Sequence, residues 1–174
     1  MNPVLARWHT LKPSDAAAEI LSCCGSRAWA AQMAAKRPYA DEQSFFAAAD
    51  DCWLHLVEAD WLEAFRSHPR IGEKHAQDKT TATSAAWSRS EQRQMNDADA
   101  AIMLRMQEGH RRYEERFGRI FIVCATGKQP AELLRILEDR LTHTHGEELQ
   151  ESARQQQQIM QLRLRKWLAG TETA

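Results

Sequence analysis

Helix-breaking residues are scarce in this chain, and their scarcity constrains the fold more than any other feature. The 174 residues include only seven glycines and five prolines. Alanine, leucine, glutamate, glutamine and arginine are frequent, and all of them favour helix. Few stretches show the period of two that a half-buried strand requires. The sequence therefore predicts an all-α fold, an irregular bundle of about seven to eight helices.

Capping signals and apolar spacing predict where these helices begin. We expect starts at Ser14 or Asp15, near Ser26, at Asp41, at Asp60, near Ser88, at Pro130 and near Gly146. Asp60 with Glu63 resembles a capping box, and the long helix from Ser88 is expected to stop at Gly118.

Four other regions lack a helical pattern. Residues 73–86 are polar and are predicted to form a loop. Phe121–Ala125 is the one short continuous apolar run, and because no partner strand is evident we interpret it as buried extended chain or a helical turn. Residues 1–13 and 170–174 are expected to be loose tails of a single domain spanning residues 1–174, a normal size for one hydrophobic core.

Charge and cysteine usage narrow the partners and the compartment. The net charge is −1, from 23 basic and 24 acidic residues, so no overall field attracts nucleic acid or an anionic membrane. The four cysteines have neither Cys-x-x-Cys nor disulfide-framework spacing and are interpreted as buried thiols in a reducing compartment. Because the N-terminus does not resemble a signal peptide and no segment is long enough to span a membrane, we expect a cytoplasmic protein.

The stretch from Phe65 to Lys74 combines a helix stop with a titratable side chain. Pro69 disfavours the α conformation at His68, so the preceding helix should end there. Gly72 permits a turn that a side chain would hinder. His68 then lies at a stiff corner, and general acid–base catalysis requires such fixed geometry. A loop histidine beside a helix-stopping proline is the structural alternative.

A second candidate group is Ser88-Arg89-Ser90-Glu91-Gln92. Ser-x-x-Glu at a helix start is a capping box, and that structural interpretation is strong. In the functional interpretation, the helix N-terminus and Ser88 bind an anionic or carbonyl ligand. Glu91 is then the partner of His68, and Gln92 offers a donor and an acceptor to an amide-like or urea-like group.

Arg163 is the third candidate. It lies four residues from both Ile159 and Trp167 on the expected last helix, so it borders the apolar stripe. Such an arginine either extends its charged end to the surface or binds a carboxylate through its planar fork. Arg165 is a rival for the same role.

Taken in order, these segments resemble the ureidoimidazoline decarboxylases of urate breakdown. The resemblance covers nearly the whole chain and rests on Trp29, Arg37-Pro38-Tyr39, Phe65 to Gly72, Ser88-x-x-Glu91-Gln92, Phe117-Gly118, Phe121 to Lys128, Glu132-Leu133-Leu134, Arg140-Leu141 and Leu162-Arg163-Leu164. The His-Pro-x-Ile-Gly and Ser-x-x-Glu-Gln elements are fairly specific together.

The resemblance implies an all-helical, usually homodimeric enzyme. It implies conversion of 2-oxo-4-hydroxy-4-carboxy-5-ureidoimidazoline to (S)-allantoin with loss of CO₂, without a cofactor or a metal. His68 matches the family's catalytic histidine and Glu91 its acidic partner. The implied substrate-contacting residues are Pro69, Ser88, Gln92, Arg163 and the backbone of Phe121, Ile122, Val123, Cys124 and Ala125. Whether His68 acts as base, acid or both stays open.

Two other functions stay open for the same residues. In a non-catalytic helical interaction module, the His-Pro corner and the Ser-x-x-Glu box would serve only structure. In a hydrolase, Cys124 would be the nucleophile and His68 its base, although the apolar run around Cys124 predicts an inert buried thiol.

Overall fold

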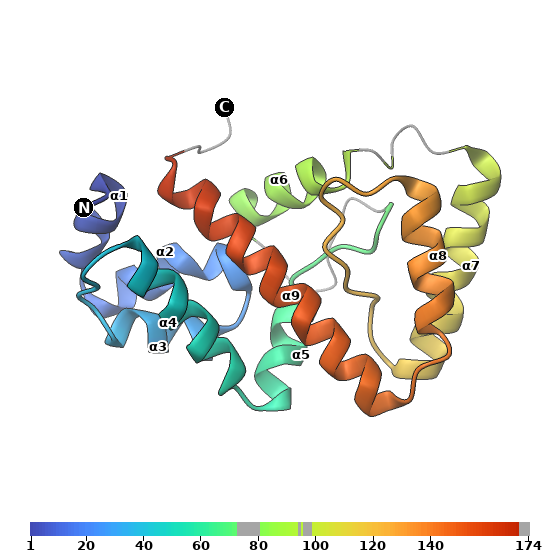
Figure 1. Ribbon diagram of the computed structural model, residues 1–174, viewed down its shortest axis with the longest axis horizontal. Coiled ribbons are helices and arrows are strands. Elements are labelled where there is room, and N and C mark those ends of the chain that lie inside the picture. The colour runs from blue at the N-terminus through green and yellow to red at the C-terminus, as the bar shows by residue number, and fades with distance from the viewer. Residues whose placement is uncertain (73–80, 94, 96–98, 171–174) are drawn as a thin grey trace. The chain divides into compact units, whose positions relative to one another are not determined.

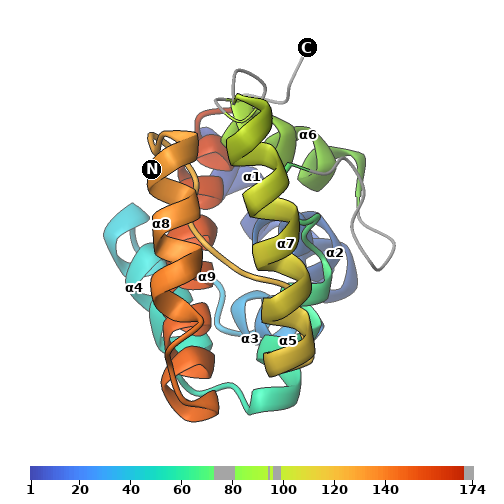
Figure 2. The same ribbon diagram turned by 90° about the vertical axis from the view of Figure 1, so that its right-hand side faces the viewer.

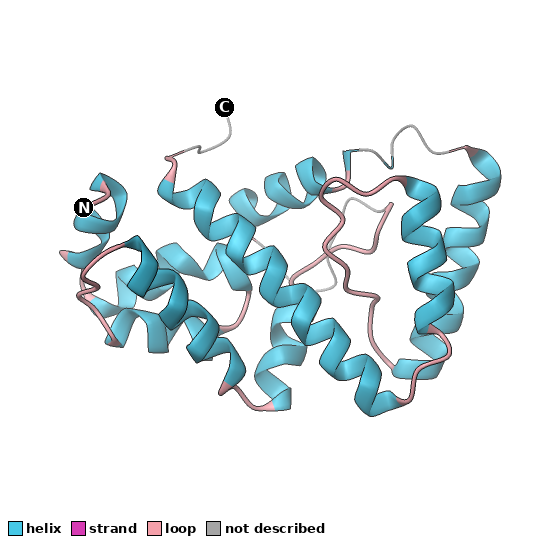
Figure 3. Ribbon diagram, in the orientation of Figure 1, coloured by secondary structure: helices cyan, strands magenta, loops and turns pink. Residues whose placement is uncertain are grey.

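The computed structural model describes residues 1–72, 81–93, 95 and 99–170 (Figure 1). In these ranges it contains nine helices and no strand (Figure 3), which confirms the all-α class. The count exceeds the predicted seven to eight because a helix forms near the N-terminus and because two helices replace the long one expected from Ser88. None of the described helices is both long and apolar enough to cross a membrane.

The helices are α1 (Pro3–His9), α2 (Pro13–Cys24), α3 (Arg27–Ala35), α4 (Glu42–Leu54), α5 (Glu58–Arg66), α6 (Ala82–Glu91), α7 (Ala100–Phe117), α8 (Pro130–Arg140) and α9 (His145–Leu168). They belong to two compact units, residues 1–64 with 157–174 and residues 65–156. Helices α5 and α9 each contribute residues to both units. The single domain stays a prediction.

The first unit has a core rich in tryptophan. Trp8, Trp29 and Trp53 are buried, and α2 and α3 pack side by side. Each buried indole needs an acceptor for its N–H. Trp8 Nε1 donates to the carbonyl of Ala16 at 2.9 Å, and Trp29 Nε1 donates to that of Ala49 at 3.0 Å. These bonds fix the large rings in one orientation.

The N-terminal residues are not the loose tail that was expected. Asn2 caps α1 by accepting from the backbone N–H of Val4 at 2.9 Å, and Pro3 occupies the first helical position. Both residue types are favoured at these positions. Leu5 and Trp8 then point into the core of the first unit. Residues 171–174 of the other expected tail lie outside the described residues.

Capping signals located some helix ends and misplaced others. Asp41 and Ser44 form a capping box, Ser26 caps α3, and Gly118 ends α7 with a φ of 68°. The expected cap at Ser14 or Asp15 is wrong, because Pro13 already begins α2. The Asp60–Glu63 capping box is also wrong. α5 begins at Glu58, and the Glu63 carboxylate pairs instead with Arg27 at the start of α3.

In the second unit, α7 and α8 lie side by side and run in the same direction (Figures 1 and 2). The 18 residues of α7 measure roughly 27 Å at about 1.5 Å per residue. The chain must return over that length before α8 begins, and residues 118–129 reach roughly 40 Å when extended. The apolar Phe121–Ala125 run is therefore extended and buried, as one of its two interpretations predicted.

Candidate active site

His68 lies at the corner that its proline predicted. Helix α5 ends at Arg66, and the N–H of His68 donates to the carbonyl of Phe65 at 3.1 Å. The imidazole is only 6% exposed, and Pro69 beside it is buried too. A buried titratable group at a fixed corner has the restricted geometry that proton transfer requires.

The turn after His68 is joined to the second predicted group. Gly72 has a φ of 88°, a conformation that L side chains rarely adopt. Its N–H donates to Oε1 of Gln92 at 2.9 Å. The Gln92 carboxamide therefore has a structural bond through its oxygen, while its N–H₂ group faces no described acceptor. This bond brings the His68 turn and the end of α6 together.

The helix start expected at Ser88 is wrong. Thr81 caps α6 by accepting from the N–H of Ser84, so Ser88 lies in the last turn and Gln92 is the C-cap. A capping box at Ser88 is therefore excluded, as is an anion site built from a helix N-terminus there. Ser88, Glu91 and Gln92 still share one face of α6, because they are spaced three and four residues apart. Ser88 is buried and Glu91 is half-buried.

The extended Phe121–Ala125 segment is held by side chains from other elements. The carbonyl of Ile122 accepts from Nη1 of Arg140 at 2.7 Å. The N–H of Cys124 donates to Oε1 of Gln155 at 2.9 Å. Among the described residues, the backbone N–H groups of Ile122 and Val123 have no acceptor. Buried N–H groups are nearly always paired, so these two are candidate donors to a ligand.

Arg140 belongs to a buried ionic network that sequence reasoning missed. The Glu148 carboxylate is fully buried and accepts from Arg140 Nε at 3.0 Å, from Nδ1 of His143 at 2.8 Å, and from the Tyr113 hydroxyl. The Arg140 guanidinium also lies 4.6 Å from the centre of the Phe121 ring. In the sequence, Arg140 stands out only through the family resemblance, because no short motif marks its partners Glu148 and Ile122, eight and 18 residues away.

The pKa of Glu148 reflects two opposing effects. Burial raises it, whereas hydrogen bonds and charge from Arg140, with bonds from Tyr113 and His143, lower it by more, so it lies below its usual value. The same burial and the Glu148 charge raise the pKa of Tyr113 to about 12. Glu148 is therefore an ionised acceptor, and Tyr113 is a neutral donor.

Arg163 belongs to the first unit and is fully buried there. Its Nη1 donates to the carbonyl of Ser22 at 3.4 Å, so its charged end does not extend to the surface. Burial raises the pKa of the Cys23 thiol, and the Arg163 charge opposes that rise. The rival Arg165 is exposed, donates to the carbonyl of Gln161 and lies over the Phe46 ring. A buried guanidinium is the stronger anion ligand, which favours Arg163.

The profile of the OHCU decarboxylase family, named for 2-oxo-4-hydroxy-4-carboxy-5-ureidoimidazoline, matches residues 9–165. The chain belongs to this family. OHCU decarboxylases are carboxy-lyases, and every predicted site residue from His68 to Arg163 lies inside the matched range.

Two relatives show how far the similarity to known proteins extends. The uric acid degradation bifunctional protein TTL of Arabidopsis thaliana is 35% identical over 146 residues, which are 83% of this chain and 44% of that protein. The chain thus spans less than half the length of that relative. The 2-oxo-4-hydroxy-4-carboxy-5-ureidoimidazoline decarboxylase of Amia calva is 31% identical over 137 residues, 78% of this chain and 77% of that protein.

Two crystal structures are similar in fold. An OHCU decarboxylase structure determined in the presence of (S)-allantoin has 32% identity and a TM-score of 0.74, covering 87% of this chain and 97% of that chain. A structure of (S)-allantoin synthase has a TM-score of 0.70 but only 15% identity, covering 94% of this chain and 53% of that chain. The second similarity concerns the fold alone.

Proposed function

We propose that this chain catalyses decarboxylation of 2-oxo-4-hydroxy-4-carboxy-5-ureidoimidazoline to (S)-allantoin in urate breakdown, without a cofactor. The observation that carries the proposal is the buried His68 imidazole on a fixed corner, in a chain of the OHCU decarboxylase family. A similar chain solved in the presence of (S)-allantoin supports the choice of product.

The reaction requires orientation and one proton. When the bond to the carboxylate breaks, CO₂ leaves, and its electron pair is delocalised over the five-membered ring of the substrate. Net turnover replaces CO₂ by H⁺ on the ring system, so one proton is consumed. The protein has to hold the breaking bond perpendicular to the ring and then protonate one face, because only one enantiomer is formed.

His68 is the proposed proton-transfer residue, and Glu91 is its acidic partner. Imidazole changes charge near neutral pH and suits either step, taking the substrate hydroxyl proton or delivering a proton to carbon. General acid–base catalysis contributes on the order of 10²–10⁴ in rate. The bond from Gly72 to Gln92 supports the pairing, since it joins the His68 turn to the α6 end that carries Glu91.

The other proposed roles concern substrate binding. Ser88 and the N–H₂ group of Gln92 face polar atoms of the substrate, and Pro69 forms part of the wall. The backbone N–H groups of Ile122 and Val123 donate to carbonyl or anionic oxygens, within the Phe121–Ala125 segment. Arg163 binds the carboxylate, since its charge is buried and its fork matches that group.

The decisive experiment replaces His68 by Asn. Substrate is generated freshly from urate, and the chirality of allantoin is followed by circular dichroism against the spontaneous racemic background. The His68→Asn variant should lose at least about 100-fold in enantioselective turnover, the lower end of a general acid–base contribution. His55→Asn is the matched control, because the His55 side chain is 74% exposed and pairs with Asp51 in the first unit.

Near-normal turnover by a folded His68→Asn protein would remove His68 from the mechanism and favour a structural role for the His-Pro corner. Absence of enantioselective turnover in the wild type would remove the proposed activity and favour a helical interaction module. The homodimer stays a prediction implied by the family resemblance, and the cytoplasmic location stays a prediction from the sequence.

A further inference from the structure

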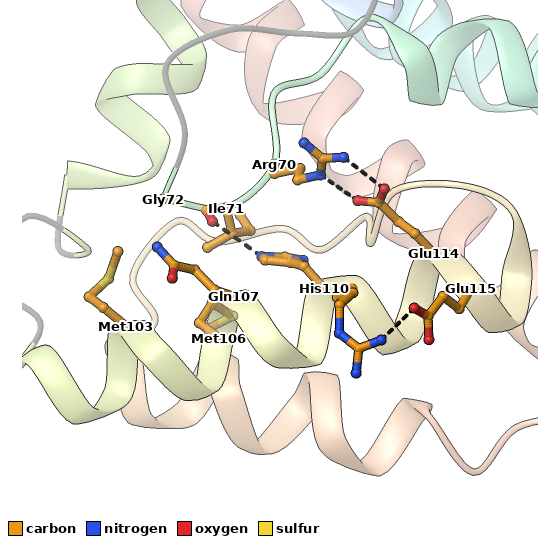
Figure 4. Close-up of a pocket in the computed structure, with 10 residues that line it drawn as sticks. Arg70, Ile71, Gly72, Met103, Met106, Gln107, His110, Glu114 and Glu115 are labelled. Carbon is orange, nitrogen blue, oxygen red and sulfur yellow. Dashed lines mark hydrogen bonds and ion pairs between the residues drawn. The ribbon is translucent and has the colours of Figure 1, made fainter.

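Three consecutive residues after His68-Pro69 are each held by a different side chain. The Arg70 guanidinium pairs in two places with the Glu114 carboxylate, with Nη2 and Oε2 2.7 Å apart. The carbonyl of Ile71 lies 3.2 Å from Nε2 of His110. The third residue, Gly72, donates to Gln92 as described above. His110 and Glu114 are spaced i, i+4 on α7, and Figure 4 shows both directed at the turn.

These contacts assign a hydrogen position and a charge. A carbonyl only accepts, so buried His110 carries a hydrogen at Nε2. The pKa of Glu114 is lowered, chiefly by the hydrogen bonds from Arg70 and further by the charges of Arg70 and His110, against the effect of burial. Glu114 is therefore a carboxylate that accepts two N–H bonds in a fixed, planar geometry.

Packing and directional bonds both hold this turn. The Ile71 side chain is buried in the hydrophobic core of the second unit. A pocket of about 330 Å³ nevertheless lies against Arg70, Ile71 and Gly72, with Met103 and Met106 among its other lining residues, so these residues are not packed against side chains on every side (Figure 4). The directional bonds from α7 and α6 therefore fix the backbone immediately after His68-Pro69.

We infer that Glu114, with His110, is a positioning residue for His68, acting through Arg70 and Ile71. The inference rests on the proposed function. The 18-residue helix α7 is a rigid support. Its contacts from Glu114 to Arg70 and from His110 to Ile71 hold the backbone beside the corner that carries the imidazole. Misplacement of a reacting group by about 1 Å costs on the order of 100-fold in rate, so the support affects turnover more than affinity.

Glu114→Gln tests this inference, with Glu115→Gln as the matched control. The substitution keeps the shape of the side chain but puts an amide N–H₂ against the Arg70 guanidinium. Glu115 is the next residue on α7, and it pairs with Arg111 instead of the turn. Both ion pairs are at least partly exposed, so neither substitution should unfold the protein. Thermal unfolding curves of the two variants check that expectation.

The first measurement is kinetic. Glu114→Gln should lower kcat by at least about tenfold while KM changes less than about twofold, and the enantiomeric excess of allantoin should fall. Glu115→Gln should match the wild type. The enantiomeric excess is compared after the spontaneous racemic background is subtracted, because a merely structural loss would lower the amount of active protein and leave the corrected excess unchanged.

The second measurement does not depend on activity. Amide hydrogen exchange at Gly72, followed by NMR, should accelerate by about tenfold in Glu114→Gln and not in Glu115→Gln. Equal exchange and kinetics in the two variants would overturn the inference, and so would faster exchange with an unchanged kcat. If the wild type showed no enantioselective turnover, the proposed function would fail on its own result, while the exchange data would still report on the turn.

Discussion

At the scale of single residues, Arg140 links the framework to the candidate site. Its guanidinium bonds the buried Glu148 carboxylate and, through Nη1, the carbonyl of Ile122. A buried ion pair is weak evidence for stability, because desolvation offsets much of the attraction. Here the ion pair holds Arg140 in place, and Arg140 in turn fixes the segment that contains Ile122 and Val123. The backbone N–H groups of these two residues are the proposed donors to the substrate.

Tyr113→Phe tests how much this network depends on neutral donors. The variant loses the hydroxyl that donates to Glu148. Its free energy of unfolding at pH 7 should be lower than that of the wild type by about 1–2 kcal/mol. Tyr39→Phe is the control, because the other tyrosine donates to the neutral carbonyl of Met33, a bond of about 0.5–1.5 kcal/mol. Urea unfolding of the three proteins measures the difference.

The cost of Tyr113→Phe should also depend on pH, with a sign fixed by Glu148. The folded-state pKa of Glu148 lies below its usual 4.5, so the unfolded state binds more protons in that range. The stabilisation is present above about 4.5 and is lost as the pH falls through the folded pKa. Tyr113 is one of the donors that lower this pKa, so the penalty should shrink in acid. A penalty that stayed constant to pH 3 would contradict this account.

At the scale of elements, the Ser88 region shows what a sequence pattern can and cannot locate. Alanine-rich α6 has one large apolar residue, Trp87, and therefore no apolar stripe, so the loop predicted for residues 73–86 is wrong from Ala82 on. Residues 73–80 of that prediction lie outside the described residues. The helix follows a cap at Thr81, and the Ser88-x-x-Glu91 spacing imitates a helix start. Because spacing determines which side chains share a face, Ser88 and Glu91 were still grouped correctly.

Local signatures accounted for the part of the site that the sequence revealed. His68-Pro69 and the apolar run at Phe121 each have a signature within a few residues. The contacts from Glu114 to Arg70 and from Arg140 to Ile122 join residues 44 and 18 positions apart. No periodicity or short motif encodes such pairs, so only the fold could reveal them.

The close approach of α7 and α8 gives a prediction at the same scale. A Cβ at Gly109 would lie 2.7 Å from Cδ2 of Leu137, which is fully buried. Alanine in a helix interior is about 1 kcal/mol better than glycine, but overpacking a tight core costs about 1–3 kcal/mol. Gly109→Ala should therefore lose about 1 kcal/mol in the free energy of unfolding.

Gly146→Ala is the control for this clash. A Cβ at Gly146, near the start of α9, would have no neighbour within 4 Å. That variant should be as stable as the wild type or up to about 1 kcal/mol more stable. Denaturant unfolding distinguishes the two, and a stabilised Gly109→Ala protein would show that the helices separate without cost.

At the scale of the whole molecule, helix continuity bears on whether the two compact units unfold together. The boundary after Gln156 falls inside the 24-residue α9, and the boundary after Ala64 falls inside α5. Independent unfolding of one unit would have to end both helices at interior residues. Helix formation is cooperative, so such breaks are unfavourable. We therefore expect a single unfolding transition, in keeping with the predicted single domain.

Alkylation of the four cysteines tests the single unfolding transition in both units in one experiment. Cys23, Cys24 and Cys52 lie in the first unit and Cys124 in the second, and all four are buried thiols that form no disulfide. Thiols react as thiolates, and burial raises the pKa of Cys23 and Cys52, so native labelling by iodoacetamide should be slow. With increasing urea, mass spectrometry should find all four sites alkylated with the same midpoint. Labelling of Cys124 at lower urea would show a second unit that unfolds alone.

The same reagent tests the hydrolase alternative, because a Cys124 nucleophile would react in the native state and turnover would stop with it.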